Sequence, residues 1–345
     1  MRRMFLIVVC TIVSSVGPLL GQAATLTGVG YADPCVIHVA PGQITTLFVT
    51  GLKTVLSQPV NATSIPLPIM LAGISVTLNQ PGNQPTPVPL LSVQQVSVCN
   101  NGGVAPPESG LTPDCLITSI TIQIPFELAF VPAPPGTPPT TPELVVSENG
   151  NVSKAFRVLP LQDNLHVINT CDVFPSPKVT SAGFCVPLVT HANGTVVTTD
   201  NPVQPGEDIV IWALGLGATT PTPKTGQPSP TPAATLSSRL YLQFDFRINA
   251  SPSRPYINPH INRTAPIFAG LTPGQVGLYQ INVRIPSSIP AVDRCGLPTS
   301  DLPTGTTGGL GFYNIVQSNL TIDIGANASL NASFDGAAIC VQPPQ

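Results

Sequence analysis

The chain has 345 residues, of which 42% are hydrophobic, 8% are charged and 42 are proline, and its formal net charge is −3. This length predicts about two domains of roughly 150 residues each, and the hydrophobic content excludes general disorder. Proline at this density excludes long helices, because each proline removes a backbone donor and fixes φ. No basic cluster beyond the N-terminus offers the cations that a nucleic-acid partner requires.

The N-terminal residues 1–23 have the features of an export signal. Arg2 and Arg3 precede an apolar run over residues 4–20, and small residues surround the expected cleavage site after Ala23. A retained membrane anchor is the alternative. No other stretch reaches the roughly 18 uninterrupted apolar residues of a spanning helix. We therefore expect a protein without a membrane span after cleavage, secreted, extracellular or at the cell surface, with the periplasm as the alternative compartment.

The first predicted module, residues 24–165, consists of short strands. Residues 74–78 alternate between apolar and polar side chains, and residues 120–124 repeat the pattern, which is typical of strands with one buried face. Asn149-Gly150 favours a type I′ hairpin turn. The predicted strands are 44–49, 73–79, 117–124, 143–147 and 154–159, with proline-rich loops at 81–89 and 132–142.

The second predicted module, residues 166–345, is built around residues 205–217, where a turn, a strand and a second turn follow one another. Apolar side chains occupy both the odd and the even positions of 209–214. We therefore expect this strand to be buried on both faces, with Trp212 in the core. The other predicted strands are 186–190, 195–199, 240–248, 278–285, 319–324 and 337–341, with a proline-rich loop at 221–232.

The two predicted modules share a repeated pattern. Pro41-Gly42 and Pro205-Gly206 are each followed, after eight residues, by Gly-Leu. Two alternating stretches then end on Pro125 and Pro286, which lie 84 and 81 residues after the first proline of their repeats. We predict an all-β fold in which two related modules follow one another, with long proline-rich loops.

The cysteines suggest disulfides, because an exported chain sits where disulfides persist. Eight cysteines are present, one of them in the signal segment, and no C-x-x-C motif points to a zinc site or a redox centre. Local spacing leaves Cys35 free or paired differently, and the connectivity stays open. The expected pairs are Cys99–Cys115, Cys171–Cys185 and Cys295–Cys340.

Three stretches have a distinctive sequence, namely residues 201–217, Gly226-Gln227-Pro228, and the string from Ala269 to Pro286. They resemble the uncharacterised Solibacter-type C-terminal domain family of secreted acidobacterial proteins. The resemblance implies two tandem immunoglobulin-like β-sandwiches of the TIG type on an exported bacterial protein. It implies no functional residue, because that family has no established activity.

No catalytic, cofactor or metal site is predicted. The four histidines, His38, His166, His191 and His260, are scattered, and none pairs at a metal-ligand spacing. Gly215-Leu216-Gly217 follows a strand but lacks the third glycine of a dinucleotide fingerprint, so we interpret it as a turn. One face of the predicted strand 240–248 carries polar groups. We expect this face to be exposed to solvent, and contact with a ligand is the alternative. These groups are Tyr241, Gln243, Asp245 and Arg247.

The sequence therefore favours a non-enzymatic adhesion or interaction module, whose partner is an unknown surface protein or a glycan. Two alternatives stay open. One is an extracellular carbohydrate-binding protein with a platform of loop aromatic residues, Tyr256, Phe312 and Tyr313. The other is a secreted hydrolase whose site is assembled across loops.

Overall fold

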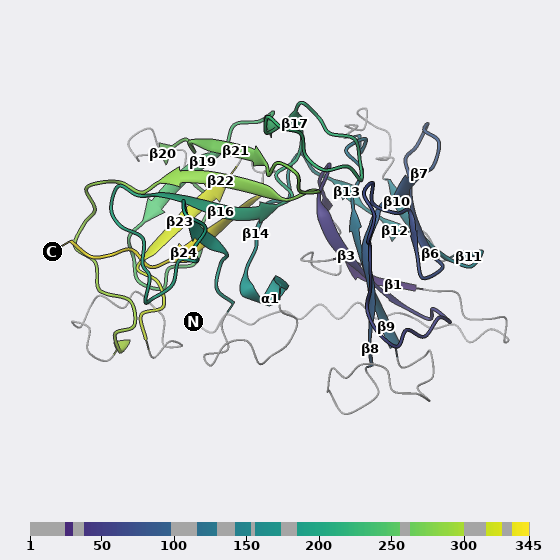
Figure 1. The fold of residues 1–345 in the computed structure, drawn as a ribbon, viewed down its shortest axis with the longest axis horizontal. Coiled ribbons are helices and arrows are strands. Elements are labelled where there is room, and N and C mark those ends of the chain that lie inside the picture. Colours follow the sequence, from purple (N-terminus) through teal and green to yellow (C-terminus); the bar gives the residue numbers. More distant parts are fainter. Residues whose placement is uncertain are drawn as a thin grey trace, which may run out of the picture.

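The computed structural model describes residues 25–29, 38–97, 116–129, 142–152, 156–173, 185–255, 263–299, 315–325 and 333–344. In this part of the chain nearly all regular structure is β-strand, and the described helix, α1 (Thr170–Val173), has four residues. The strands form two groups, which lie side by side (Figure 1). None of the described helical structure is long and apolar enough to cross a membrane.

The first group has two main sheets. One has the order β1 (Thr25–Val29), β3 (Ile44–Thr50), β9 (Leu116–Gln123), β8 (Leu90–Ser97) and β4 (Val60–Asn61). The other has the order β11 (Asn151–Val152), β10 (Glu143–Glu148), β6 (Ile74–Asn79) and β5 (Met70–Leu71), with β12 (Phe156–Arg157) on β10 and β7 (Thr86–Val88) on β6. A short parallel pair joins β2 (His38–Val39) to β13 (Leu159–Pro160).

These two sheets enclose one hydrophobic core, because their strands turn alternate residues inward. Ile74, Val76 and Leu78 of β6 are at most 1% exposed, and Ile120 and Ile122 of β9 are fully buried. The alternation in the sequence predicted these residues as core residues, and that prediction is confirmed. The turn at Asn149-Gly150, with φ of 45° and 86°, joins β10 to β11 as expected for a type I′ hairpin.

The second group also has two sheets. The larger has the order β14 (His166–Val167), β16 (Asp208–Leu214), β22 (Tyr279–Arg284), β21 (Phe268–Leu271), β18 (Thr235–Leu236) and β17 (Thr219–Thr220), and β15 (Val189–His191) also pairs with β16. The smaller has the order β20 (Arg263–Thr264), β19 (Tyr241–Asp245), β23 (Leu320–Gly325) and β24 (Phe334–Ile339).

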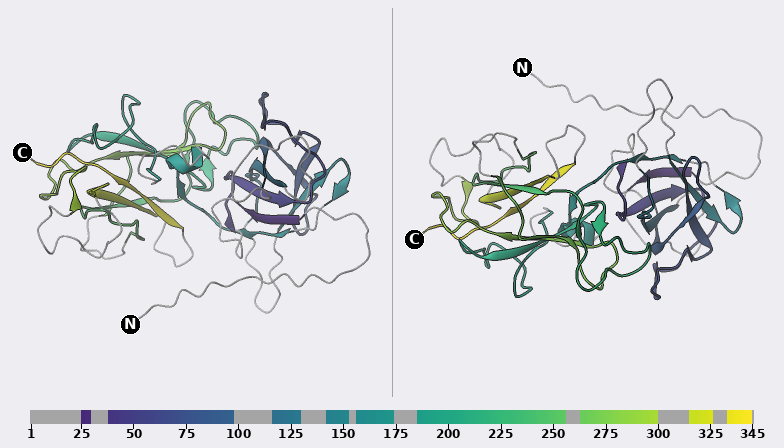
Figure 2. Two further views of the ribbon diagram at one scale, coloured as in Figure 1. Left: turned by 90° about the horizontal axis from the view of Figure 1, so that it is seen from below. Right: turned by 90° about the horizontal axis from the view of Figure 1, so that it is seen from above.

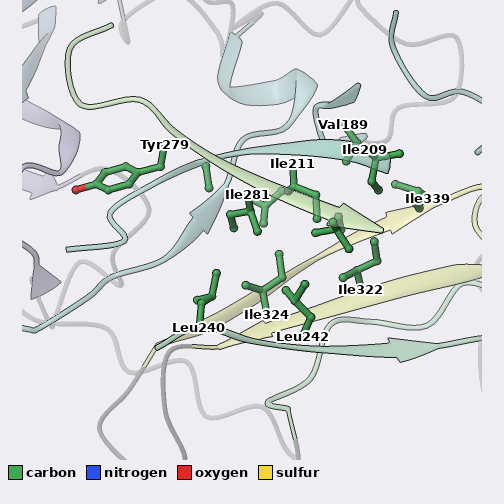
Figure 3. Close-up of a cluster of buried hydrophobic side chains, with 14 of the residues drawn as sticks. Val189, Ile209, Ile211, Leu240, Leu242, Tyr279, Ile281, Ile322, Ile324 and Ile339 are labelled. Carbon is green, nitrogen blue, oxygen red and sulfur yellow. The ribbon is translucent and has the colours of Figure 1, made fainter. Parts of the chain in front are cut away.

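The core of the second group lies between its two sheets (Figure 3). Ile211 of β16 and Ile281 of β22 point from the larger sheet toward Leu242, Ile322 and Ile324 of the smaller one, and all five are fully buried. The chain is therefore all-β, and in each group two sheets pack about a core of their own.

The central strand pairs of the two groups have the same register. Pro205 follows Pro41 by 164 positions, and Pro286 follows Pro125 by 161. With these offsets, the Ile44↔Gln123 pair of β3 and β9 corresponds to the Asp208↔Arg284 pair of β16 and β22, which the structure contains. The turn bonds also correspond, because Gly42 N–H donates to the Ile124 carbonyl and Gly206 N–H donates to the Ile285 carbonyl.

One predicted feature of β16 is wrong. Ile209, Ile211 and Ala213 are buried in the core. On the other face Leu214 is buried as predicted, but Val210 and Trp212 are only half-buried. Trp212 does not belong to the described core cluster. The strand is central in its sheet, yet a central position buries only the face that meets the second sheet, so the apolar second face stays partly open.

A proline-rich loop joins the two groups. Within residues 221–232, the Gly226 N–H donates to Gln123 Oε1 at 2.7 Å, and its carbonyl accepts a hydrogen bond from the Leu67 N–H at 2.8 Å. Thr225 Oγ1 accepts from the Phe126 N–H at 2.9 Å, and the Phe126 ring packs against the core of the second group. Figure 2 shows this green part of the chain between the two groups.

Candidate functional site

His166 in β14 lies beside two carboxylates. Its Nε2 lies 2.8 Å from Asp172 Oδ2 in α1, and its Nδ1 lies 3.6 Å from Asp335 Oδ2 in β24. Burial raises the pKa of Asp335, although the N–H groups of Val167 and Gly336 donate to its carboxylate. The cluster therefore fastens three elements of the second group to one another.

A serine beside this cluster, Ser333, lacks the arrangement of a catalytic nucleophile. Its hydroxyl donates to Asp163 Oδ1 and accepts from the Leu165 N–H at 2.8 Å. Asp163 also accepts from the Ser333 N–H at 3.0 Å, and burial raises the pKa of this carboxyl group. A nucleophilic serine requires its proton to face a general base that can carry it to the leaving group. Here the serine and aspartate instead hold the start of β24 against the chain before β14.

Two further buried carboxylates hold loops against strands. Glu148, at the end of β10, accepts from the N–H groups of Lys53 at 2.8 Å and Thr54 at 2.6 Å. Burial by itself would raise the pKa of Glu148, but these hydrogen bonds outweigh it and lower the pKa. Asp323 of β23 accepts from the Ser253 N–H and hydroxyl at 2.8 and 2.9 Å, and burial raises its pKa.

The histidines that the sequence singled out do not converge. His191 Nδ1 lies 2.5 Å from Glu207 Oε1, which ties β15 to the turn before β16. His38 lies in β2 of the first group, and His260 lies outside the described residues. Among the residues that the structure describes, no three His, Cys, Asp or Glu side chains gather as metal ligands would.

The Gly-x-Gly motif after β16 packs the chain that links the two groups. Gly215 and Gly217 have φ of 72° and 85°, and a Cβ on either would collide with the carbonyl oxygen of Asn164 or Gln162. The Tyr279 hydroxyl donates to the Gly217 carbonyl at 2.6 Å, and burial raises the pKa of this phenol well above its usual value. The motif is a close-packed turn, and its carbonyl is used by the fold.

The outward face of the smaller sheet is covered by the chain itself. Gln243 pairs with Asp323, so both lie on the face that was interpreted as solvated. Asp323 is fully buried there, because the segment 251–255 crosses it and Ser253 binds its carboxylate. Pro252 and Pro255 of this segment lie beside Gly336 and Gly325, where a Cβ would be within about 3 Å of the proline rings. The face that was interpreted as solvated is therefore covered at Asp323, whereas its predicted groups are half-buried or exposed, namely Tyr241, Gln243, Asp245 and Arg247.

The remaining predicted groups on that face pair with each other. Arg247 lies just after β19, and its Nη2 is 2.5 Å from Asp245 Oδ2. The Arg263 guanidinium lies 4.9 Å from the centre of the Tyr241 ring, within the range of a cation–π contact. Both arginines are thus engaged by neighbours on the same sheet.

The outward face of the larger sheet carries a different set of side chains. Trp212 pairs with Gln280 of β22, and Asn282 of the same strand pairs with Phe268 of β21. Cross-strand pairs and alternate positions share a face, so these four side chains lie together opposite the core. All four are half-buried. We call them the Trp212 face.

Two contacts fix the surroundings of the Trp212 face. The indole Nε1–H of Trp212 donates to Thr190 Oγ1 at 3.3 Å, which orients the ring. At the end of the face, the Arg284 guanidinium binds both oxygens of Asp208 at 2.7 Å. The hydrogen bond from Arg284 lowers the pKa of Asp208. This pair neutralises itself, so the face presents aromatic rings and neutral amides.

The expected Cys295–Cys340 disulfide is present. Cys185 is also disulfide-bonded. The other predicted cysteines, Cys35, Cys99, Cys115 and the side chain of Cys171, lie outside the described residues, as do the aromatic residues of the predicted loop platform, Tyr256, Phe312 and Tyr313.

Sequence reasoning missed the Trp212 face because it placed Trp212 in the core. The available signal was the alternation of Gln280, Asn282 and Arg284 along the neighbouring strand, which marks the same face as polar. No protein-family model matches the chain, and no curated protein sequence matches it.

Proposed function

We propose that the chain is an exported, non-catalytic protein of two tandem immunoglobulin-like sandwiches of the TIG type, acting as an adhesion or interaction module at the cell surface. One contrast carries the proposal. The carboxylates of Glu148, Asp163 and Asp323 bind the protein's own loops, whereas the Trp212 face presents aromatic and amide groups outward. Acids that are held by the protein's own loops, together with a neutral outward face, suit binding better than acid–base chemistry.

Other observations support the architecture and the compartment in this proposal. The equal registers of β3–β9 and β16–β22 are expected if one sandwich plan is used twice. The apolar N-terminal run favours export, and the Cys295–Cys340 disulfide suits an oxidising compartment. The resemblance to secreted acidobacterial domains points the same way.

The hydrolase alternative receives less support. Its best candidate nucleophile, Ser333, gives its proton to a carboxylate whose other contacts fix the backbone. His166 is engaged by the carboxylates of Asp172 and Asp335. A mechanism would require both groups to leave these contacts.

The test combines location, binding and turnover. The producing cells are fractionated, and the purified labelled chain is then applied to intact cells with an excess of unlabelled chain as competitor. We expect the protein outside the cytoplasm, with saturable binding that the competitor displaces and that heat-unfolded chain does not show. A cytoplasmic location would contradict the proposal. Turnover of a hydrolase substrate that Ser333→Ala abolishes without unfolding the chain would replace it with the hydrolase.

A further inference from the structure

We propose that the Trp212 face binds a neutral carbohydrate chain, with the rings of Trp212 and Phe268 stacking on sugar rings and the amides of Gln280 and Asn282 binding their hydroxyl groups. The inference rests on the proposed function, because it names the ligand class of an interaction module. It assigns the ligand to the larger sheet of the second group and not to the loop aromatic residues that the sequence suggested.

The geometry places two aromatic rings on either side of an amide. Trp212 pairs with Gln280, and Gln280 pairs in turn with Gly270. The Phe268 ring folds toward Gly270, since its Cζ lies 2.8 Å from where a Cβ at Gly270 would stand. Adjacent strands are about 4.8 Å apart, and Phe268 lies two residues along the strand from the position opposite Trp212, so the two aromatic positions are separated by about 12 Å. Sugars that are separated by one further pyranose in an extended chain can reach both positions.

The chemistry of the face matches a sugar. A pyranose has an apolar C–H face and hydroxyl groups at its edge, so it stacks on aromatic rings and exchanges hydrogen bonds with amides. The amide oxygen of Asn282 is buried with no hydrogen-bond partner in the protein, although a buried polar atom normally has one. This oxygen meets a ligand hydroxyl group only if the half-buried Asn282 side chain turns outward on binding.

The charges favour a neutral ligand. Asp208 and Arg284, at the end of the face, bind each other through two hydrogen bonds of 2.7 Å. Only 8% of the residues in the chain are charged. A polyanion such as an acidic polysaccharide would need unpaired cations, and a face of aromatic rings and amides does not offer them.

The outward faces of the two sheets differ in the contacts that the described residues make. On the smaller sheet, the chain lays residues 251–255 across the outward face and binds them to Asp323. On the larger sheet, Trp212 and Phe268 remain half-buried. Two aromatic rings and two amides on one flat face match a stacked carbohydrate better than a protein partner, whose interface core would be more apolar.

Trp212 is the single tryptophan of the chain, so fluorescence excited at its absorption edge reports directly on this face. The purified chain is titrated with a soluble β-1,3-glucan, a β-1,4-mannan and a chitin hexasaccharide. We expect at least one of them to shift the Trp212 emission to shorter wavelength and to protect it from acrylamide, with saturation. An unchanged emission with all three would overturn the proposal.

Variants locate the site by affinity electrophoresis in gels that contain the bound polysaccharide. Trp212→Ala is expected to weaken binding about tenfold, because one stacked ring contributes about 1.4 kcal/mol at the upper end of aromatic pair energies. Trp212→Phe keeps a ring, so its affinity is expected to stay within about threefold of the wild-type affinity. This variant preserves the test if the alanine variant does not fold. The matched control is Phe334→Ala, an exposed aromatic residue on β24, which should bind as the wild type does. Equal loss in the control and in Trp212→Ala would refute the assignment.

Treatment of intact cells separates failure of this inference from failure of the proposed function. An excess of the polysaccharide that shifts the Trp212 emission is expected to abolish binding of the labelled chain to cells, whereas protease treatment of the cells leaves it. Binding that only protease abolishes would keep the interaction module but assign a protein to the Trp212 face, which overturns the carbohydrate proposal. Absence of any saturable binding to cells would remove the proposed function itself.

Discussion

The Tyr279 hydroxyl donates a hydrogen bond to the Gly217 carbonyl, and removing it tests how much this bond stabilises the turn at Gly215-Leu216-Gly217. Tyr279→Phe removes the hydroxyl donor and leaves the buried Gly217 carbonyl without this hydrogen bond, which lowers the free energy of unfolding by about 1 to 3 kcal/mol. With a urea dependence of about 2 kcal/mol per molar, a loss of 2 kcal/mol lowers the unfolding midpoint by about 1 M. Trp212 lies in the same sheet, so its fluorescence reports this transition.

The control for this prediction is Tyr241→Phe. Tyr241 is half-buried on β19 and its ring contacts Arg263, so loss of its hydroxyl should change stability by less than about 0.5 kcal/mol. The reasoning fails if Tyr279→Phe is as stable as wild type, or if the two substitutions lower the midpoint equally. Either outcome would mean that the Gly217 turn does not depend on the buried phenol.

Two other predictions concern the second group. Burial raises the pKa values of Asp163, Asp323 and Asp335, so these carboxyl groups bind protons more readily in the folded than in the unfolded chain. The free energy of unfolding should therefore increase as the pH falls from these raised pKa values toward the ordinary value near 3.9. A urea midpoint that drops steadily from pH 7 to pH 4.5 would contradict this prediction. Replacing Cys295 and Cys340 by serine opens a loop with a sequence separation of 45 residues and should lower the free energy of unfolding by about 4 kcal/mol. Urea unfolding without reductant measures this loss. An unchanged midpoint would show that the disulfide is dispensable.

Alternation in the sequence was sufficient to predict the central strands. β6 and β22 carry apolar residues at every second position, and β3 and β9 do so over part of their length. All four end near a proline or a turn, so local pattern and final burial agree. The same reasoning missed β8, because the register shifts between Leu90 and Ser92 and breaks the alternation. It also placed β7 inside a proline-rich loop and expected β24 three residues late, at 337 instead of Phe334.

The candidate site was harder to predict, because alternation shows which residues share a face but not what covers that face. The faces of β19 and β16 both carry polar and aromatic residues, yet only the first is crossed by residues 251–255. The carboxylate contacts are equally hidden, since Glu148 binds Lys53 and Thr54 across more than 90 positions of sequence. Such contacts depend on how loops fold back, and no periodic pattern in the sequence records them.

The central claim is that one sandwich plan is used twice, each time around its own core, and the equivalent residues Ile120 and Ile281 test it most directly. Replacing either fully buried isoleucine by alanine should cost about 3 kcal/mol, or about 1.5 M in urea midpoint. We predict that Ile281→Ala shifts the Trp212 fluorescence midpoint by this amount, whereas Ile120→Ala shifts only the part of the circular dichroism transition that belongs to the first group. Equal shifts of the Trp212 midpoint by both substitutions would show a single shared core and contradict the account.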